Sequence, residues 1–290
     1  MAASTQIRAT DPQFMFMLFI RSLAITFLAL IITACSSSGK KEQLTEKQYY
    51  DQAQKAKDGS RFVLAIEKLQ QLESRYPFGR YANQAQLEII YAYYRGLDYE
   101  SAVAAAQRFI RLHPDHPELD YAYYMKGLAA YSVDRGLLER FIPSDFSERD
   151  MGPARESFED FSRLINQFPA SKYAEDARQR MIYLRNLLAK YEVRVARFYM
   201  KRQAFVAAAN RAQYVIDNFD KTPSIPNALE IQYQAYLELG MQDLAKTSLE
   251  VLKYNYPNYH KLTSEGTLKY DPGIYGRKSV LNAVSFGLID

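Results

Sequence analysis

The chain contains very little cysteine, histidine, glycine and proline, and it has no tryptophan. Its 290 residues include one Cys, three His, 12 Gly and 11 Pro. A single cysteine excludes an internal disulfide. Scarce Gly and Pro with abundant Ala, Leu, Glu and Lys are typical of helical chains. A net charge of only +4 is too small to indicate nucleic-acid binding.

Sequence signatures of catalysis are also missing. There is no glycine-rich phosphate loop and no supported Ser-His-Asp arrangement. His113 and His116 lie among prolines, which favours a turn over a metal site, and His260 has no acidic or Cys partner at ligand spacing. We therefore predict no catalytic residue, no metal and no cofactor. An enzyme with an unrecognised site, such as a peptidoglycan-modifying hydrolase, is one alternative.

The first 34 residues are predicted to be a signal peptide. Arg21 precedes an apolar run over 22–34 that ends in a small residue before Cys35. The segment Ile32–Cys35 (ITAC) resembles the lipobox of bacterial lipoproteins, in which cleavage leaves the cysteine to carry fatty acyl chains. We expect lipidation of Cys35, followed by a linker over 35–44.

A retained transmembrane anchor is the alternative interpretation of this region. Residues 14–34 are long enough to cross a bilayer. Arg21, however, would place a charge within the membrane, which costs about 2.5–3.5 kcal/mol near the centre. Translation from Met15 or Met17 would instead make Arg21 a short charged leader, so residues 1–14 are expected to be an over-long start.

The remainder of the chain is organised by an internal repeat. A small residue recurs five times, with a large apolar residue seven positions later and an aromatic residue or histidine eleven positions later. The small residues are Ala65, Ala102, Ser157, Ala208 and Ala245. The apolar residues are Leu72, Phe109, Leu164, Val215 and Leu252. The terminal residues are Tyr76, His113, Phe168, Phe219 and Tyr256, followed in four copies by proline.

Each position of the repeat has a physical reason. A small residue lets two helices approach closely, the apolar residue extends the same stripe, and a residue before proline leaves the helical region. Such units resemble tetratricopeptide repeats. We predict an all-α fold, an α-solenoid of five tetratricopeptide-like helix pairs over 45–260, after the lipoprotein signal peptide. Residues 135–153 are expected to be an excursion between helices, and 261–290 a flexible C-terminal tail.

Two groups of residues stand out as candidate binding surfaces. Arg211 lies beside Asn210 in an apolar helix, where a charge is difficult to place without a partner. Aromatic residues are concentrated in the turn 76–81 and in the segment 91–94. Their number exceeds the need of one helix pair and suggests a groove for an extended, apolar and aromatic peptide.

Four segments carry a more specific resemblance. They are Arg75–Gly79 (RYPFG), Ile90–Tyr94 (IYAYY), Arg108–Leu112 (RFIRL) followed by His116 and Pro117, and Leu188–Glu192 (LAKYE). They are similar to segments of the BamD (ComL-like) family, tetratricopeptide-repeat lipoproteins of the outer-membrane β-barrel assembly machine. The resemblance covers residues 47–257.

The resemblance implies a non-catalytic scaffold lipid-anchored at the periplasmic face of the outer membrane. Ser36, after Cys35, favours sorting to that membrane. The C-terminal repeats would dock on the barrel subunit BamA, with Asn210 and Arg211 as contacts. Arg108 and Arg111 match the face that receives the lipoprotein BamC.

The N-terminal repeats would recognise the C-terminal strand of unfolded barrel proteins, which ends in an aromatic residue. The candidate residues are Tyr76, Phe78, Tyr81 and Tyr94. A different periplasmic repeat lipoprotein, coordinating envelope or peptidoglycan processes, is the other alternative. The RYPFG turn and the 55-residue interval between the second and third repeats argue against it.

Overall fold

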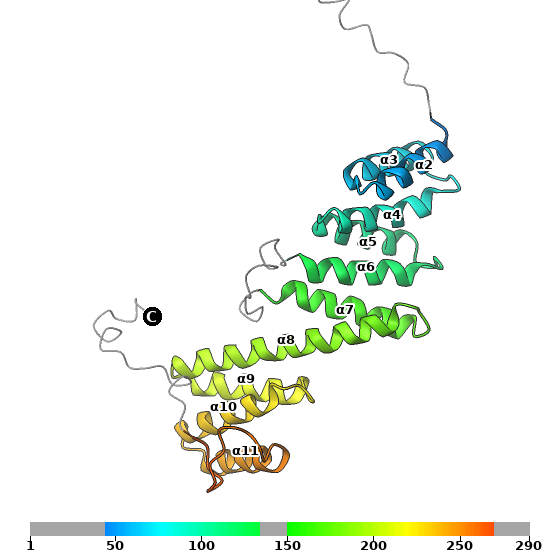
Figure 1. Cartoon of the computed structure of the whole chain (residues 1–290). Helices are drawn as coiled ribbons and strands as arrows, with labels where there is room; N and C mark the ends of the chain where they lie inside the picture. The colour runs from blue at the N-terminus through cyan, green and yellow to red at the C-terminus, as the bar shows by residue number, and fades with distance from the viewer. Residues whose placement is uncertain (1–43, 134–149, 270–290) are drawn as a thin grey trace, which may run out of the picture. The chain divides into compact units, whose positions relative to one another are not determined.

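The computed structural model describes residues 44–133 and 150–269, and these residues form ten helices (Figure 1). The first five are α2 (Glu46–Asp58), α3 (Phe62–Arg75), α4 (Ala82–Arg95), α5 (Tyr99–Leu112) and α6 (Leu119–Ser132). The next five are α7 (Gly152–Gln167), α8 (Ala174–Lys201), α9 (Phe205–Asn218), α10 (Ile225–Glu238) and α11 (Gln242–Asn255). Within these ranges, the only β-pairing is an isolated bridge between Leu262 and Leu268.

The helices form five consecutive pairs, which confirms the predicted fold class. Each helix packs against the next one in the chain, and α4 also contacts α6 as α8 contacts α10. Figure 1 shows the same succession of neighbouring helices from α2 to α11. Because contacts form mainly between neighbours along the chain, each pair is stabilised by the pairs before and after it.

The repeat positions identified in the sequence have the structural roles expected of them. All five aligned small residues, and all five apolar residues seven positions later, are at most 1% exposed. The five terminal residues are the C-caps of α3, α5, α7, α9 and α11, with φ between −133° and −126°. Phe219 has this geometry although Asp220 follows it, so the turn does not require proline.

The turn within a helix pair is built differently. Four of these turns contain a residue with positive φ, two positions after the first helix ends: Ser60, Leu97, Gln203 and Gly240. This backbone region favours glycine, but only one of the four positions is glycine. The pair turns are therefore determined by helix packing more than by local preference.

The 28-residue α8 connects two hydrophobic cores. Leu184 and Leu188 belong to a core formed with α4–α7, whereas Val193 and Met200 belong to a second core formed with α9–α11. In Figure 1, α8 is visibly the longest helix. It thus provides the continuous element that joins the third pair to the fourth.

Residues after α11 continue the packing. Leu262 and Leu268 contact the second core, and Lys261 forms an ion pair with buried Glu230 of α10 at 2.9 Å. These residues begin the predicted tail, while 270–290 lie outside the described residues. The predicted signal peptide, Cys35 and residues 134–149 of the predicted excursion also lie outside them. Among the helices described, none is both long and apolar enough to cross a bilayer.

Candidate functional site

A hollow of about 340 Å³ lies among the first helices of the N-terminal pairs. Its lining includes Tyr91 of α4, Tyr121 of α6 and Tyr173, which immediately precedes α8. One cation and three carboxylates also line it: Lys57 and Asp58 of α2, Glu88 of α4 and Glu118, which precedes α6. The hollow therefore combines aromatic rings with polar groups, a composition suited to a peptide.

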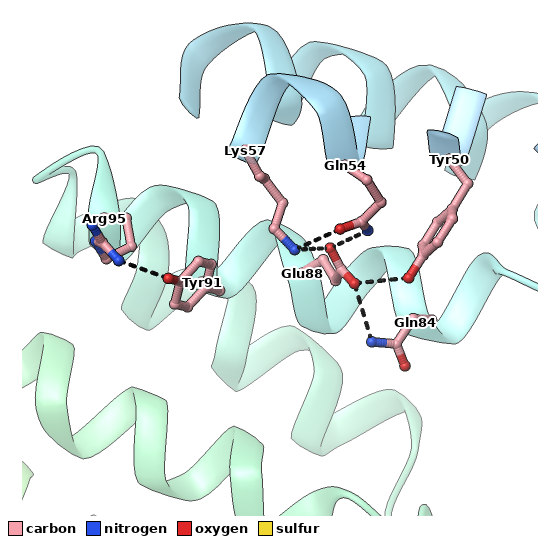
Figure 2. Close-up of polar contacts among 7 residues, drawn as sticks. All are labelled: Tyr50, Gln54, Lys57, Gln84, Glu88, Tyr91 and Arg95. Carbon is pink, nitrogen blue, oxygen red and sulfur yellow. Dashed lines mark hydrogen bonds and ion pairs between the residues drawn. The ribbon is translucent and has the colours of Figure 1, made fainter. Parts of the chain in front are cut away.

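Glu88 is the centre of the polar network beside this hollow (Figure 2). Its carboxylate accepts hydrogen bonds from Tyr50 Oη at 2.9 Å and Gln54 Nε2 at 2.6 Å, and it forms an ion pair with Lys57. Gln84, one turn earlier on α4, donates at 3.3 Å. Because Tyr50, Gln54 and Lys57 all belong to α2, one side chain connects α2 directly to α4.

The network fixes the charge of Glu88. Burial by itself would raise the pKa of this carboxyl, but the hydrogen bonds from Lys57, Gln54 and Tyr50 outweigh burial and lower it. Burial and the bond to Glu88 raise the pKa of Tyr50, and burial raises the pKa of Tyr121. At neutral pH the network thus contains an ionised Glu88 and a neutral Tyr50, and the phenol of Tyr121 in the wall of the hollow is neutral as well.

The four aromatic residues predicted to contact substrate do not line this hollow. Tyr76, Phe78 and Tyr81 share the turn between α3 and α4, whereas Tyr94 lies near the far end of α4. The helix has 14 residues, and a rise of 1.5 Å per residue separates its ends by about 20 Å. The structure therefore brings three of the four together and places the fourth elsewhere.

Their environments also differ. Tyr81 stacks on Tyr50 with ring centroids 4.6 Å apart, which places it one ring away from Glu88 and the hollow. Tyr76 is half-buried as the C-cap of α3, and Tyr94 packs against the first core. Phe78 is fully exposed. Of the aromatic residues of the hollow, Tyr91 belongs to the segment 91–94 noted in the sequence, whereas Tyr121 and Tyr173 were missed because they lie further along the chain.

The two arginines predicted to receive BamC lie on α5. Arg108 forms an ion pair with Glu73 of α3 and lines a second hollow of about 300 Å³ between α3, α4 and α5. Arg111 is exposed in the last turn of α5. Only Arg108 of this pair is therefore held by a contact between two repeats.

Arg211, predicted to need an external partner, has one within the chain. Its Nη1 lies 2.8 Å from Oε2 of Glu192, and Arg155 Nη2 lies 2.9 Å from the other carboxylate oxygen. The Glu192 side chain is 2% exposed, whereas that of Arg211 is 37% exposed. Asn210 is exposed beside it. The partner that a charge in this apolar helix was expected to need therefore lies within the chain, and part of the guanidinium still faces solvent.

Glu192 connects three helices at the boundary of the two cores. Arg155 comes from α7, Glu192 from α8 and Arg211 from α9, and Glu192 lies between Leu188 of the first core and Val193 of the second. The sequence contains Glu192 in the LAKYE segment but gives no signal of its role. Two arginines around one carboxylate leave a local charge of +1 at a partly exposed surface.

The described residues contain no cluster of three or more His, Cys, Asp or Glu side chains arranged to hold a metal ion. His113 and His116 instead pack on Phe109, with ring centroids at 4.8 and 5.1 Å, and His113 Nε2 contacts Gln86 Oε1 at 3.0 Å.

Comparison with known proteins gives a consistent result. The family profile described as YfiO, outer membrane lipoprotein, matches residues 42–252. The outer membrane protein assembly factor BamD of Neisseria meningitidis is 40% identical over 243 residues, covering 81% of this chain and 91% of that protein. BamD of Vibrio cholerae is 39% identical over 228 residues, covering 79% and 95%.

A distant likeness links the chain to the crystal structure of MamA protein, at 15% identity and a TM-score of 0.32 over 74% of this chain and 95% of that one. The profile spans most of the helix pairs, and the relatives match over nearly their full length. The chain therefore belongs to the BamD family of outer membrane protein assembly factors.

Proposed function

We propose that this chain is a non-catalytic scaffold lipoprotein that binds BamA and unfolded β-barrel proteins and promotes their folding and insertion. It is anchored through Cys35 at the periplasmic face of the outer membrane. The observation that carries the proposal is the separation of two features of different chemistry. A tyrosine-lined hollow lies in the N-terminal pairs, and a partly exposed arginine lies in the fourth pair.

The hollow is the site for the unfolded substrate. Tyr91, Tyr121 and Tyr173 offer rings on which an aromatic side chain can stack. Lys57 is already paired with Glu88, so the polar contacts that the hollow offers to an extended chain are mainly carboxylate acceptors for its N–H groups. Tyr81 extends this surface through its stack on Tyr50. Tyr76 and Tyr94 contribute mainly to packing.

Crosslinking tests the substrate site. A photoreactive phenylalanine analogue replaces Tyr91, or the exposed Leu112 at the end of α5 as a control. The probe is a peptide of barrel-protein C-terminal sequence, compared with the same peptide ending in serine. We expect crosslinks at position 91 that depend on the aromatic end. Equal labelling at both positions, or indifference to the final residue, would refute the site.

Asn210 and Arg211 form the contact with BamA. The +1 cluster around Glu192 suits an acidic group on the partner, because the exposed part of the Arg211 guanidinium retains donors. Arg108 and Arg111, on α5, form the surface for BamC. Neither assignment requires a conformational change of the helix pairs.

The test of the BamA contact must separate binding from stability, since Arg211→Glu also places a second carboxylate beside buried Glu192. Arg155→Glu is the matched control, because it perturbs Glu192 equally from α7 without altering the α9 surface. We expect BamA co-purification to fall with Arg211→Glu and not with Arg155→Glu. Equal loss with both variants would assign the effect to folding and contradict a direct contact.

A further inference from the structure

The turn between α3 and α4, residues 76–81, presents a phenylalanine that the helix packing does not use. Phe78 is 100% exposed, more than any other large hydrophobic side chain among the described residues. Tyr254 and Val63 follow at 87% and 83%. A single exposed apolar side chain is common on protein surfaces, so the backbone and the charges around Phe78 decide what the ring can bind.

The turn that carries Phe78 is well defined. Gly79 N donates to Tyr76 O at 3.0 Å, and Tyr81 N donates to the Glu46 carboxylate at 2.6 Å. A Cβ at position 79 would lie 2.2 Å from that carboxylate oxygen, so a larger residue there would displace the Glu46 side chain and its hydrogen bond to the turn. The ring of Phe78 is thus held outward on a fixed turn.

Charge around the ring favours an anionic surface. Arg75 and Arg80 are exposed, and within the described residues neither forms an ion pair. They lie instead over the rings of Tyr49 and Tyr81, at 5.7 and 5.9 Å. The segment 74–81 contains no acidic residue. An aromatic ring between cations is the arrangement by which proteins bind the headgroup region of a membrane.

The position of the turn along the chain supports the same partner. The helix pair that carries it follows directly after the linker, and Glu46 is only the eleventh residue after Cys35. Eleven extended residues span at most about 40 Å. A lipid attached at Cys35 would therefore confine this pair to the vicinity of a bilayer, where one ring and two cations can bind with little further loss of freedom.

We propose that the turn 76–81 is a second membrane contact, in which Phe78 enters the lipid headgroup region and Arg75 and Arg80 bind lipid phosphates. The inference rests on the proposed anchoring at Cys35. It assigns Phe78 to lipid rather than to the unfolded substrate, and it leaves Tyr81 and the hollow to the substrate. The contact would orient the first helix pair relative to the membrane surface.

The test uses the full-length acylated protein in phosphatidylethanolamine and phosphatidylglycerol vesicles. Because acylation consumes the thiol of Cys35, Ser74→Cys in the last turn of α3 provides a single site for an environment-sensitive fluorophore. Brominated lipids quench the probe when it lies at the bilayer. Val63→Cys, an exposed site near the start of α3, is the control position.

We expect at least three-fold stronger quenching at position 74 than at position 63. Adding Phe78→Ser should reduce the signal at position 74 to the control level. Equal quenching at both positions, or a signal that is unchanged by Phe78→Ser, would overturn the proposal. Flotation of the same vesicles reports anchoring independently, so a protein that fails to float contradicts the anchor at Cys35 and not merely the turn.

Discussion

Replacing Glu88 by glutamine tests the network that connects the first helix pair to the second. Glu88 accepts from Tyr50, Gln54 and Lys57 of α2 at once, and its side chain is 11% exposed. An amide keeps one acceptor oxygen but places an NH2 group against these donors. The substitution is close in size, so the expected effect comes from hydrogen bonding and charge and not from packing.

The size of the expected destabilisation follows from Lys57, which loses its ion-pair partner. Removing one member of a buried ion pair costs about 3–5 kcal/mol. The Lys57 side chain is 16% exposed and borders the hollow, so part of this cost is recovered by hydration. We expect a loss of about 2–3 kcal/mol in the free energy of unfolding. For a domain of this size that corresponds to a decrease in Tm of roughly 4–12 °C.

The assay is urea unfolding followed by circular dichroism, together with hydrogen exchange of α2 and α3. In a linear array of repeats the loss should be concentrated in the first pair, because only one neighbour supports it. Glu67→Gln is the control, since that carboxylate is 56% exposed and 3.6 Å from Lys68. A change of less than 0.5 kcal/mol for Glu88→Gln, or protection lost evenly along the chain, would refute the reasoning.

The same variant should change the pH dependence of stability. The pKa of Glu88 in the folded protein lies below its ordinary value of 4.5, so its stabilising contribution is complete above that value and disappears as the pH falls through the folded pKa. The difference in the free energy of unfolding between wild type and Glu88→Gln should therefore be constant near pH 7 and shrink below about pH 4. A difference in the free energy of unfolding that grows on acidification would contradict the lowered pKa of Glu88.

Three further predictions concern stability, each measured by urea unfolding. Leu97→Gly should stabilise the protein by about 0.5–1 kcal/mol, because Leu97 is exposed at φ 65° and glycine relieves this strain; destabilisation would contradict that view. Gly127→Ala should destabilise the protein by about 1–3 kcal/mol, because the added Cβ would lie 2.8 Å from the Phe161 ring and this clash outweighs the better helix propensity of alanine. A gain in stability would mean that α6 and α7 can move apart. Asp160→Asn should cost about 1–3 kcal/mol, because Lys126 is 5% exposed and keeps only the half-exposed Glu156 as an ion-pair partner. A neutral result would show that Glu156 alone compensates the charge of Lys126.

The fold could be predicted because the same pattern of residues recurs five times along the sequence. Each helix pair can be recognised from a small residue, an apolar residue and a helix-ending residue at fixed spacing, without knowledge of the neighbouring pair. The turns within pairs could not be predicted in this way. Gly59 and Gly96 lie one position before the residues that adopt positive φ, Ser60 and Leu97. Packing of the two helices imposes that conformation on residues whose local preference opposes it.

The candidate site was less accessible to sequence reasoning, because side chains meet across helices that are distant in the chain. Density of aromatic residues along the sequence pointed to the turn 76–81 and to the segment 91–94, which contributes Tyr91, whereas Tyr121 and Tyr173 of the hollow come from two later segments. The role of Glu88 could not be predicted from the sequence either, because its three α2 partners precede it by 31–38 residues. Only the stacking of first helices brings these groups together.

Arg211 shows how a sequence argument can find a site without identifying the partner. The argument held that a charge in an apolar helix needs a partner, and Glu192 supplies that partner within the chain. In the proposed contact, an acidic group of BamA would share a guanidinium that is already paired, and it would gain less than it would from an unpaired arginine. What Glu192 contributes in return is a fixed orientation, because the carboxylate is 2% exposed and held from the other side by Arg155. Neutralising Glu192 should thus raise the positive charge at the surface but leave the orientation of the Arg211 guanidinium less defined. Such a variant separates electrostatic attraction from positioning at the proposed contact.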